Sequence, residues 1–219
     1  MIERFITAIS VTDVPGEDLA GTRERLKERF PRGATRRMTQ LGLLVGAALD
    51  DMSPQAQDSV VYASAYAESR ALEGYLDSFP SASPTLFQTS IHPSAVQQAL
   101  IGRQHAVGEF FPLTGRAHLV AHALETALLS PAPRVLLCGG EERGTWLLDQ
   151  NIASARSFAF ALALNDRSTG ALARVRLRSV SEPTPVSEYT LPEFFDALRA
   201  RQTIDCAVRP GVRLELQWL

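Results

Sequence analysis

Short apolar runs alternate with helical patterns along most of the chain, and this alternation limits the fold more than any other feature. The clearest run, Val135-Leu136-Leu137-Cys138, ends in Gly139-Gly140, which is typical of a buried strand that delivers a loop. Strands alternating with helices favour an α/β layered fold with a largely parallel or mixed sheet. We predict further strands over 5–11, 58–64, 157–164, 171–180 and 212–218, and helices over 19–30, 39–49, 69–79, 93–101, 116–129 and 191–201.

Size and composition indicate one good-sized domain. The chain has 219 residues, 45% of them apolar and 21% charged, values near the globular average that exclude wholesale disorder. Its 22 basic and 24 acidic residues give a net charge of −2, which argues against a dedicated nucleic-acid binder. We expect residues 1–180 to form the main domain and 181–219 a C-terminal extension that packs on it, with the proline-rich stretch 181–187 as a surface linker.

The sequence predicts neither a membrane span nor export. The longest apolar runs, 41–49 and 158–164, fall far short of the roughly 20 residues that cross a bilayer. The first six residues lack the basic start, apolar core and cleavage site of a secretory signal. Two cysteines, Cys138 and Cys206, provide no disulfide framework and no cysteine-based zinc cluster. We therefore expect a soluble, cytoplasmic protein.

Several segments, taken in chain order, resemble the N-terminal half of a β-ketoacyl synthase of the thiolase fold. The resemblance covers roughly residues 2–180 and is to the small bacterial β-ketoacyl synthase-like N-terminal domains. The matching segments are 6–11 (ITAISV, similar to ITGIGVVS), 36–41 (RRMTQL, similar to the start of RRMDRFSQLALAA), 83–87 and 91–98 (SPTLF and IHPSAVQQ, before the nucleophile), 116–118 (RAH, similar to GAH) and 135–142 (VLLCGGEE, similar to VLAGGTE).

The resemblance implies an α/β fold that is a single thiolase-like half. We therefore expect a mostly parallel, five-stranded mixed sheet with helices on both faces. Half of a thiolase fold exposes a large apolar face, which is unfavourable by roughly 25 cal/mol per Å². We expect the extension from about residue 181 to cover part of this face, and a partner protein to be obligatory.

The family's nucleophile is missing from this chain. In the family, the catalytic cysteine stands in a turn at a helix N-terminus, five residues before the matched histidine, where the helix dipole favours a thiolate. Counting back from His118 leads to Leu113, followed by Thr114, and leucine has no nucleophilic atom. The family's catalytic histidines and lysine belong to a C-terminal half that this sequence does not match. The resemblance thus implies a chain that is no enzyme alone, but part of an acyltransferase (ketosynthase) complex.

A thiolase-fold chain without its nucleophile resembles a chain-length factor, the inactive partner in a ketosynthase heterodimer. The resemblance is to the chain-length-factor-like subunit of aryl polyene biosynthesis. It implies a role in aryl polyene, polyketide or fatty-acid-type chain elongation, with a ketosynthase as partner, an acyl carrier protein as a further partner, and no cofactor. Residues expected to line the acyl tunnel or the subunit interface are Phe87, Ile91, His92, Phe110, Phe111, Pro112 and His118.

Two other functions remain open from the sequence. The chain has the residue types of a small thioesterase or acyltransferase, in which Thr114, Ser90 or Cys138 would act with His118. It is also compatible with a stand-alone module that binds an acyl carrier protein. Cys138 by itself is best interpreted as an inert core thiol, because free cysteine is usually buried.

Two side-chain patterns have a structural and a functional interpretation. His118, His122 and Glu125 share one helix face, a spacing that can hold a metal, but a further ligand is needed and we predict no metal site. The arginines at 174, 176 and 178 form a basic stripe that suits an acidic carrier protein. A solvated strand face is the simpler interpretation of that stripe.

Overall fold

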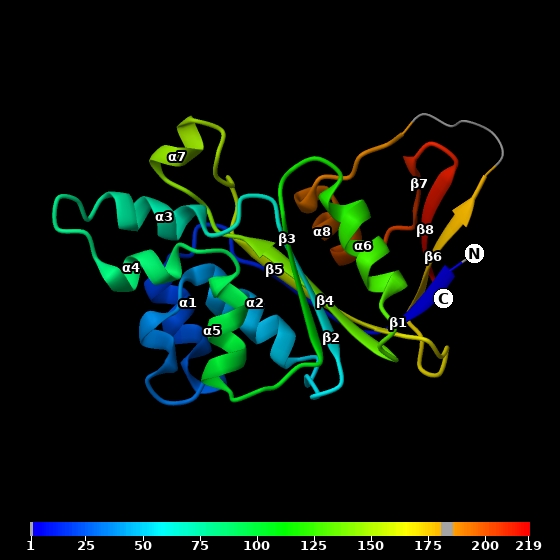
Figure 1. Cartoon of the computed structure of the whole chain (residues 1–219), viewed down its shortest axis with the longest axis horizontal. Helices are drawn as coiled ribbons and strands as arrows, with labels where there is room; N and C mark the ends of the chain where they lie inside the picture. The colour runs from blue at the N-terminus through cyan, green and yellow to red at the C-terminus, as the bar shows by residue number, and fades with distance from the viewer. Residues whose placement is uncertain (1, 181–185) are drawn as a thin grey trace.

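The computed structural model describes residues 2–180 and 186–219, and their eight strands form one mixed sheet (Figure 1). The strand order is β3-β2-β4-β5-β1-β6-β8-β7. Strands β3, β2 and β4 are parallel, whereas all other neighbouring pairs are antiparallel. The strands are β1 (Ile2–Asp13), β2 (Ser59–Ser64), β3 (Glu109–Thr114), β4 (Arg134–Glu141), β5 (Phe158–Asn165), β6 (Ala173–Ser179), β7 (Ile204–Arg209) and β8 (Val212–Trp218).

The α/β class, with helices on both faces of one sheet, is confirmed, but the predicted sheet differs in two details. It has eight strands rather than five, and it is mostly antiparallel rather than mostly parallel. The strand predictions missed β3 and β7, which form the two edges of the sheet. Pro112 lies inside β3, and proline is tolerated there because an edge strand leaves backbone N–H groups unpaired. Of the predicted linker 181–187, residues 181–185 lie outside the described part of the chain.

One face of the sheet is covered by α1 (Leu19–Leu26), α2 (Gln40–Asp50) and α5 (Ser94–Gly102). Strand β5 reads Phe-Ala-Phe-Ala-Leu-Ala-Leu, so its alanines all point to this face and its large side chains to the other. The small alanine surface lets α2 lie close to the sheet, which explains why nearly all of α2 is buried. A Cβ on Gly46 would lie 2.8 Å from Ala99, so α2 and α5 approach each other at this glycine.

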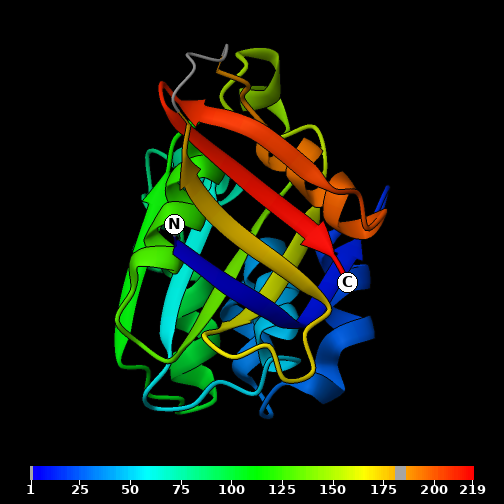
Figure 2. The same cartoon turned by 90° about the vertical axis from the view of Figure 1, so that its right-hand side faces the viewer.

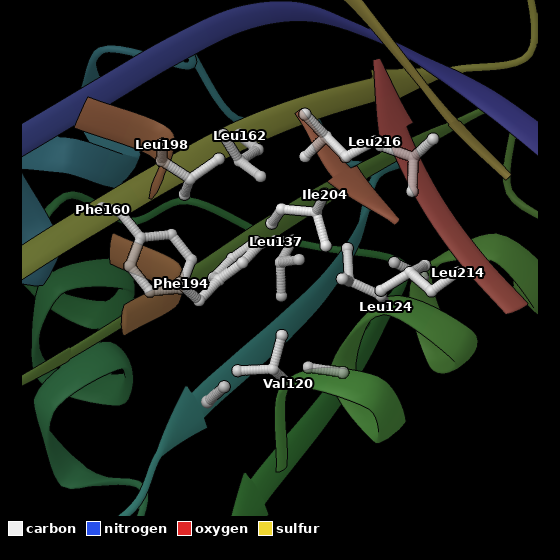
Figure 3. Packing of buried hydrophobic residues seen from close by; sticks show 14 of the residues in the cluster. Val120, Leu124, Leu137, Phe160, Leu162, Phe194, Leu198, Ile204, Leu214 and Leu216 are labelled. Atoms are coloured by element: carbon white, nitrogen blue, oxygen red, sulfur yellow. The ribbon is translucent and has the colours of Figure 1, made fainter. Parts of the chain in front are cut away.

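The opposite face is covered by α6 (Leu119–Leu129) and α8 (Leu191–Arg199), which share one apolar core with the sheet (Figure 3). Phe158 lies with its ring centroid 4.6 Å from that of Phe195, and Phe160 lies 5.5 Å from Phe194. A capping box between Thr190 and the third residue of the helix fixes the start of α8. Strands β6, β8 and β7 extend the sheet beyond β1 and curve around this core (Figure 2).

Three short helices gather at the end of the molecule away from β6, β8 and β7 (Figure 1). They are α3 (Ser69–Leu76), α4 (Pro84–Thr89) and α7 (Trp146–Asp149), and α3 and α4 project as an arm. Two 3-10 helices, η1 (Lys27–Arg29) and η2 (Ala34–Arg37), connect α1 to α2. Within the described ranges, no helix has both the length and the apolar character to cross a membrane.

Candidate functional site

Leu113 and Thr114, the residues predicted at the nucleophile position, end β3 directly before α6. The chain then turns through left-handed backbone, with a φ of +127° at Gly115 and +56° at His118. This strand, sharp turn and helix form the local geometry in which a nucleophile is usually presented. Leu113 is half-buried against the core below α6, and Thr114 is exposed. None of the described residues forms a hydrogen bond with the Thr114 hydroxyl.

A carboxylate from the C-terminal extension occupies the N-terminus of α6. Glu188 Oε1 accepts a hydrogen bond from the backbone N–H of His118 at 2.6 Å. A negative charge at this end of a helix is favoured by about 0.3–1 kcal/mol, the same effect that stabilises a thiolate in an active site. The backbone N–H of Ser187 holds the segment in place by donating to Ala207 of β7 at 2.9 Å. The positive end of the α6 dipole therefore faces the Glu188 carboxylate.

Phe110 and Phe111, two of the three tunnel or interface candidates on β3, do not line a common space. Phe110 packs against the core below α2 and α5, whereas Phe111 packs against the core below α6. Pro112, the residue after Phe111, is exposed at the edge of the sheet. Adjacent residues of a strand point to opposite faces, so any space lined by Phe111 excludes Phe110.

Phe87 and Ile91, two further tunnel or interface candidates, lie in an exposed apolar region on α3, α4 and the turn that follows. Phe87 is 49% exposed and Ile91 is 48% exposed. The rings of Phe87 and Phe79 both contact Tyr75, with centroids 5.3 Å and 5.4 Å away. We call this region the apolar arm, and its exposed apolar residues are Leu72, Leu76, Phe79, Leu86, Phe87 and Ile91.

His92, also predicted at the tunnel or interface, belongs to a buried polar cluster. Its ring stacks on Tyr62 of β2 with a centroid distance of 5.1 Å, and its Nδ1 lies 3.1 Å from Glu68 Oε2. The other oxygen of Glu68 accepts from the backbone N–H of Ala95, so the carboxylate ties the start of α3 to the start of α5. The sequence analysis missed Tyr62 and Glu68, because neither has a spacing that links it to His92.

No protein-family model matches the sequence, and no curated protein matches it. Among solved structures, a chain of the ketosynthase ApeO in complex with its chain length factor ApeC, from Xenorhabdus doucetiae, is similar with a TM-score of 0.67 and 20% identity, over 99% of this chain and 100% of that one. The ishigamide ketosynthase/chain length factor follows with a TM-score of 0.61 and 15% identity, over 82% and 68%. The chain has a ketosynthase fold.

A third structure with the ketosynthase fold, a β-ketoacyl synthase from Burkholderia phymatum STM815, has a TM-score of 0.55 and 13% identity, over 85% of this chain and 67% of that one. The match to the ApeO–ApeC complex extends along the whole of both chains, whereas the other two cover about two thirds of longer proteins. The predicted resemblance to a thiolase-like half is confirmed at the level of the fold.

The ketosynthase fold of this chain places Cys138 and His118 on opposite sides of the sheet. Cys138 is fully buried in the core below α2, whereas His118 begins α6 on the other face. Burial raises the pKa of the Cys138 thiol to about 12. Ser90 was another candidate nucleophile, and its hydroxyl donates a hydrogen bond to the Phe87 carbonyl at 2.8 Å. The geometry supports the inert-thiol interpretation of Cys138 and does not form a Cys138–His118 pair.

The other two side-chain patterns also have structural explanations. Arg176 and Arg178 of β6 both form ion pairs with Glu215 of β8, and Arg174 donates to Gln217 at 2.8 Å. The neighbouring strand therefore holds the basic stripe in place, but Glu215 offsets only one of its three positive charges. The rings of His118 and His122 lie edge to face, with centroids 6.3 Å apart. In the described ranges, no group of three or more histidine, cysteine or acidic residues is arranged to hold a metal ion.

Glu141 is a buried carboxyl group that the sequence analysis did not single out. It ends β4 and is 1% exposed, and it accepts hydrogen bonds from the backbone N–H of Ala65 at 2.5 Å and from the Ser64 hydroxyl at 3.2 Å. Burial raises its pKa to about 8, although the hydrogen bond from Ala65 acts in the opposite direction. The group therefore prefers its protonated form in the folded protein.

We expect the stability of the protein to fall as pH rises through the pKa of Glu141. Because the folded pKa is above the unfolded value, the stabilising contribution is complete below about pH 4.5 and is lost as pH approaches about 8. Glu141→Gln keeps the acceptor oxygen but cannot ionise, so it should remove roughly 2–4 kcal/mol of this pH-dependent loss. Urea unfolding at several pH values measures the difference. Parallel stability curves for the variant and the wild type would contradict this assignment.

Proposed function

We propose that this chain is a non-catalytic, chain-length-factor-like partner of a ketosynthase, which stabilises the heterodimer and shapes its acyl tunnel. Leu113 is the main support for the proposal, because it stands one residue before the end of β3, at the turn where the fold would present a nucleophile, and offers no atom that forms an acyl thioester. The likeness to a chain of the ApeO–ApeC complex, over the whole of both chains, supports it. The reaction served is aryl polyene, polyketide or fatty-acid-type elongation.

The surface proposed for the ketosynthase combines the open edge of β3 with the apolar arm. In the described chain β3 is hydrogen-bonded to β2 alone, so its outer edge is available for pairing with another chain. Exposed contiguous apolar surface such as the apolar arm commonly marks an interaction site. One partner that covers both features would satisfy backbone groups and bury apolar side chains together.

We further propose that residues 181–219 replace part of the missing half of the fold, with residues 1–180 as the main domain. In the described part of this extension, Phe194 and Phe195 of α8 pack into the core that α6 also contacts. The same role places the subunit in the cytoplasm, where an acyl carrier protein would deliver the growing chain to the complex. The carrier protein is thus a second partner in this proposal.

Co-expression with a ketosynthase from the same source, chosen from any encoded beside this chain, tests the proposal. We expect a 1:1 complex by size-exclusion chromatography with light scattering. Ile91→Asp in the apolar arm should weaken the complex at least about tenfold, since it puts a charge into an apolar interface. Leu129→Asp, at an exposed leucine at the end of α6, is the matched control and should leave it intact. If the chain forms no complex with the ketosynthase, the proposal is overturned, and a stand-alone module that binds an acyl carrier protein is favoured.

A further inference from the structure

A cavity of about 1350 Å³ lies away from Leu113 and Thr114, at the opposite end of β1 from the N-terminus. It opens where the end of β1, the loop after β4 and the approach to β5 meet α1, η2, α3, α4 and α7. Small-molecule sites in proteins usually occupy about 300–1,000 Å³, so the space is ample for one. The residues that line it include none of those predicted for the nucleophile position, tunnel or interface.

Six arginine and five acidic side chains form the charged lining of this cavity. Arg70 is paired with Glu73 and Arg156 with Asp13, and both are thereby neutralised. Arg23 donates only to backbone carbonyls and so keeps its positive charge uncompensated. Three more are exposed and have no acidic partner among the described residues; they are Arg36 and Arg37 of η2 and Arg143 after β4.

Asp149 is exposed without an ion pair in the described part of the chain and offsets part of this positive charge, whereas the other acidic residues of the cavity offset less of it. Glu17 is paired with Arg25, and the Asp18 side chain caps α1 by accepting from Gly21. Glu142 accepts from the backbone N–H of Leu41 at 3.0 Å, and burial raises its pKa to about 7, which reduces its negative charge. The whole chain carries a net charge of −2, so the positive character of the cavity is local.

We propose that this arginine cleft binds a small amphipathic anion, whose carboxylate or phosphate head contacts Arg36, Arg37 and Arg143. Guanidinium groups form paired hydrogen bonds with the oxygens of either head group. Apolar side chains, among them Val14, Met38 and Leu148, share the lining and suit an apolar body. The arginine cleft does not involve β3 or the nucleophile position, and Leu86 is the one residue of the apolar arm that lines it.

Calorimetric binding to the full chain, in the assembly in which it purifies, tests this proposal. The probes are decanoate, decyl phosphate and uncharged decanol, which share one apolar chain. Decanoate tests a carboxylate head group, decyl phosphate tests a phosphate head group, and decanol tests the apolar chain without a charge. We expect at least one of the two anions to bind and decanol to bind at least about tenfold more weakly. Arg36→Gln combined with Arg143→Gln should weaken anion binding by about tenfold or more, and added salt should also weaken it.

Arg167→Gln is the matched control, since Arg167 is an exposed arginine in the turn between β5 and β6 and does not line the cavity. It should leave binding unchanged. Equal binding of decanol, or anion binding that Arg167→Gln weakens as much as the double variant, overturns the proposal. Binding of an acidic carrier protein that depends on Arg36 and Arg143, with no binding of either small anion, also overturns it and assigns the arginines to a protein contact.

Discussion

Gly140→Ala is expected to unfold the protein or to destabilise it by at least about 3 kcal/mol. An added Cβ at Gly140 would lie 2.3 Å from the Phe158 carbonyl oxygen, which is backbone and cannot rotate away. The contact lies within the antiparallel pairing of β4 and β5, where Gly140 is opposite Ala159, so relief requires the ladder to open. Urea unfolding of the purified variant, or its loss from the soluble fraction, measures the effect.

Gly74→Ala provides the matched control, because a Cβ at Gly74 in α3 would meet nothing within 4 Å. Alanine is the better helix former, so this variant should be as stable as the wild type or more stable by up to about 1 kcal/mol. If Gly140→Ala unfolds at the same urea concentration as the wild type, β4 and β5 do not approach each other as closely at Gly140 as the structure shows.

The same glycine shows where sequence reasoning was incomplete. Gly139-Gly140 was predicted to form the loop after a short strand, but β4 continues through both glycines to Glu141. Their small size serves close approach of Ala63, Phe158 and Phe160 from the neighbouring strands. A glycine pair at the end of an apolar run looks the same in the sequence whether it forms a loop or lets neighbouring strands approach closely. The residues that approach it are distant in the sequence, so the local pattern does not distinguish the two.

Predictions for the fold and the site succeeded where the signal was local. The small and apolar residues of 39–49 and the apolar run over 157–164 predicted α2 and β5, and the ordered segments predicted the ketosynthase fold. The edge strand β3 was missed because its six residues include Pro112 and both faces are partly exposed. The arginine cleft was missed because Arg36 and Arg143 approach one space only after β4 and η2 have been positioned by the fold.

Phe195→Ala is expected to cost about 3–5 kcal/mol and to lower the melting temperature by about 10 °C. Phe195 is fully buried in α8, and its ring lies 4.6 Å from that of Phe158, so truncation leaves a cavity between the C-terminal extension and the sheet. This loss is the result to expect if the extension is part of the core rather than an appendage. Thermal unfolding of the full chain measures it.

Phe87→Ala removes the same side chain from the apolar arm, where Phe87 is 49% exposed, and should change stability by less than about 0.5 kcal/mol. Its expected effect is instead on the ketosynthase complex, because an exposed aromatic side chain contributes most when a partner covers it. Both substitutions replace phenylalanine by alanine, so together they distinguish an effect on folding from an effect on formation of the ketosynthase complex. A Phe195→Ala protein that melts with the wild type would remove α8 from the core, whereas a Phe87→Ala protein that pairs with wild-type affinity would remove Phe87 from the interface.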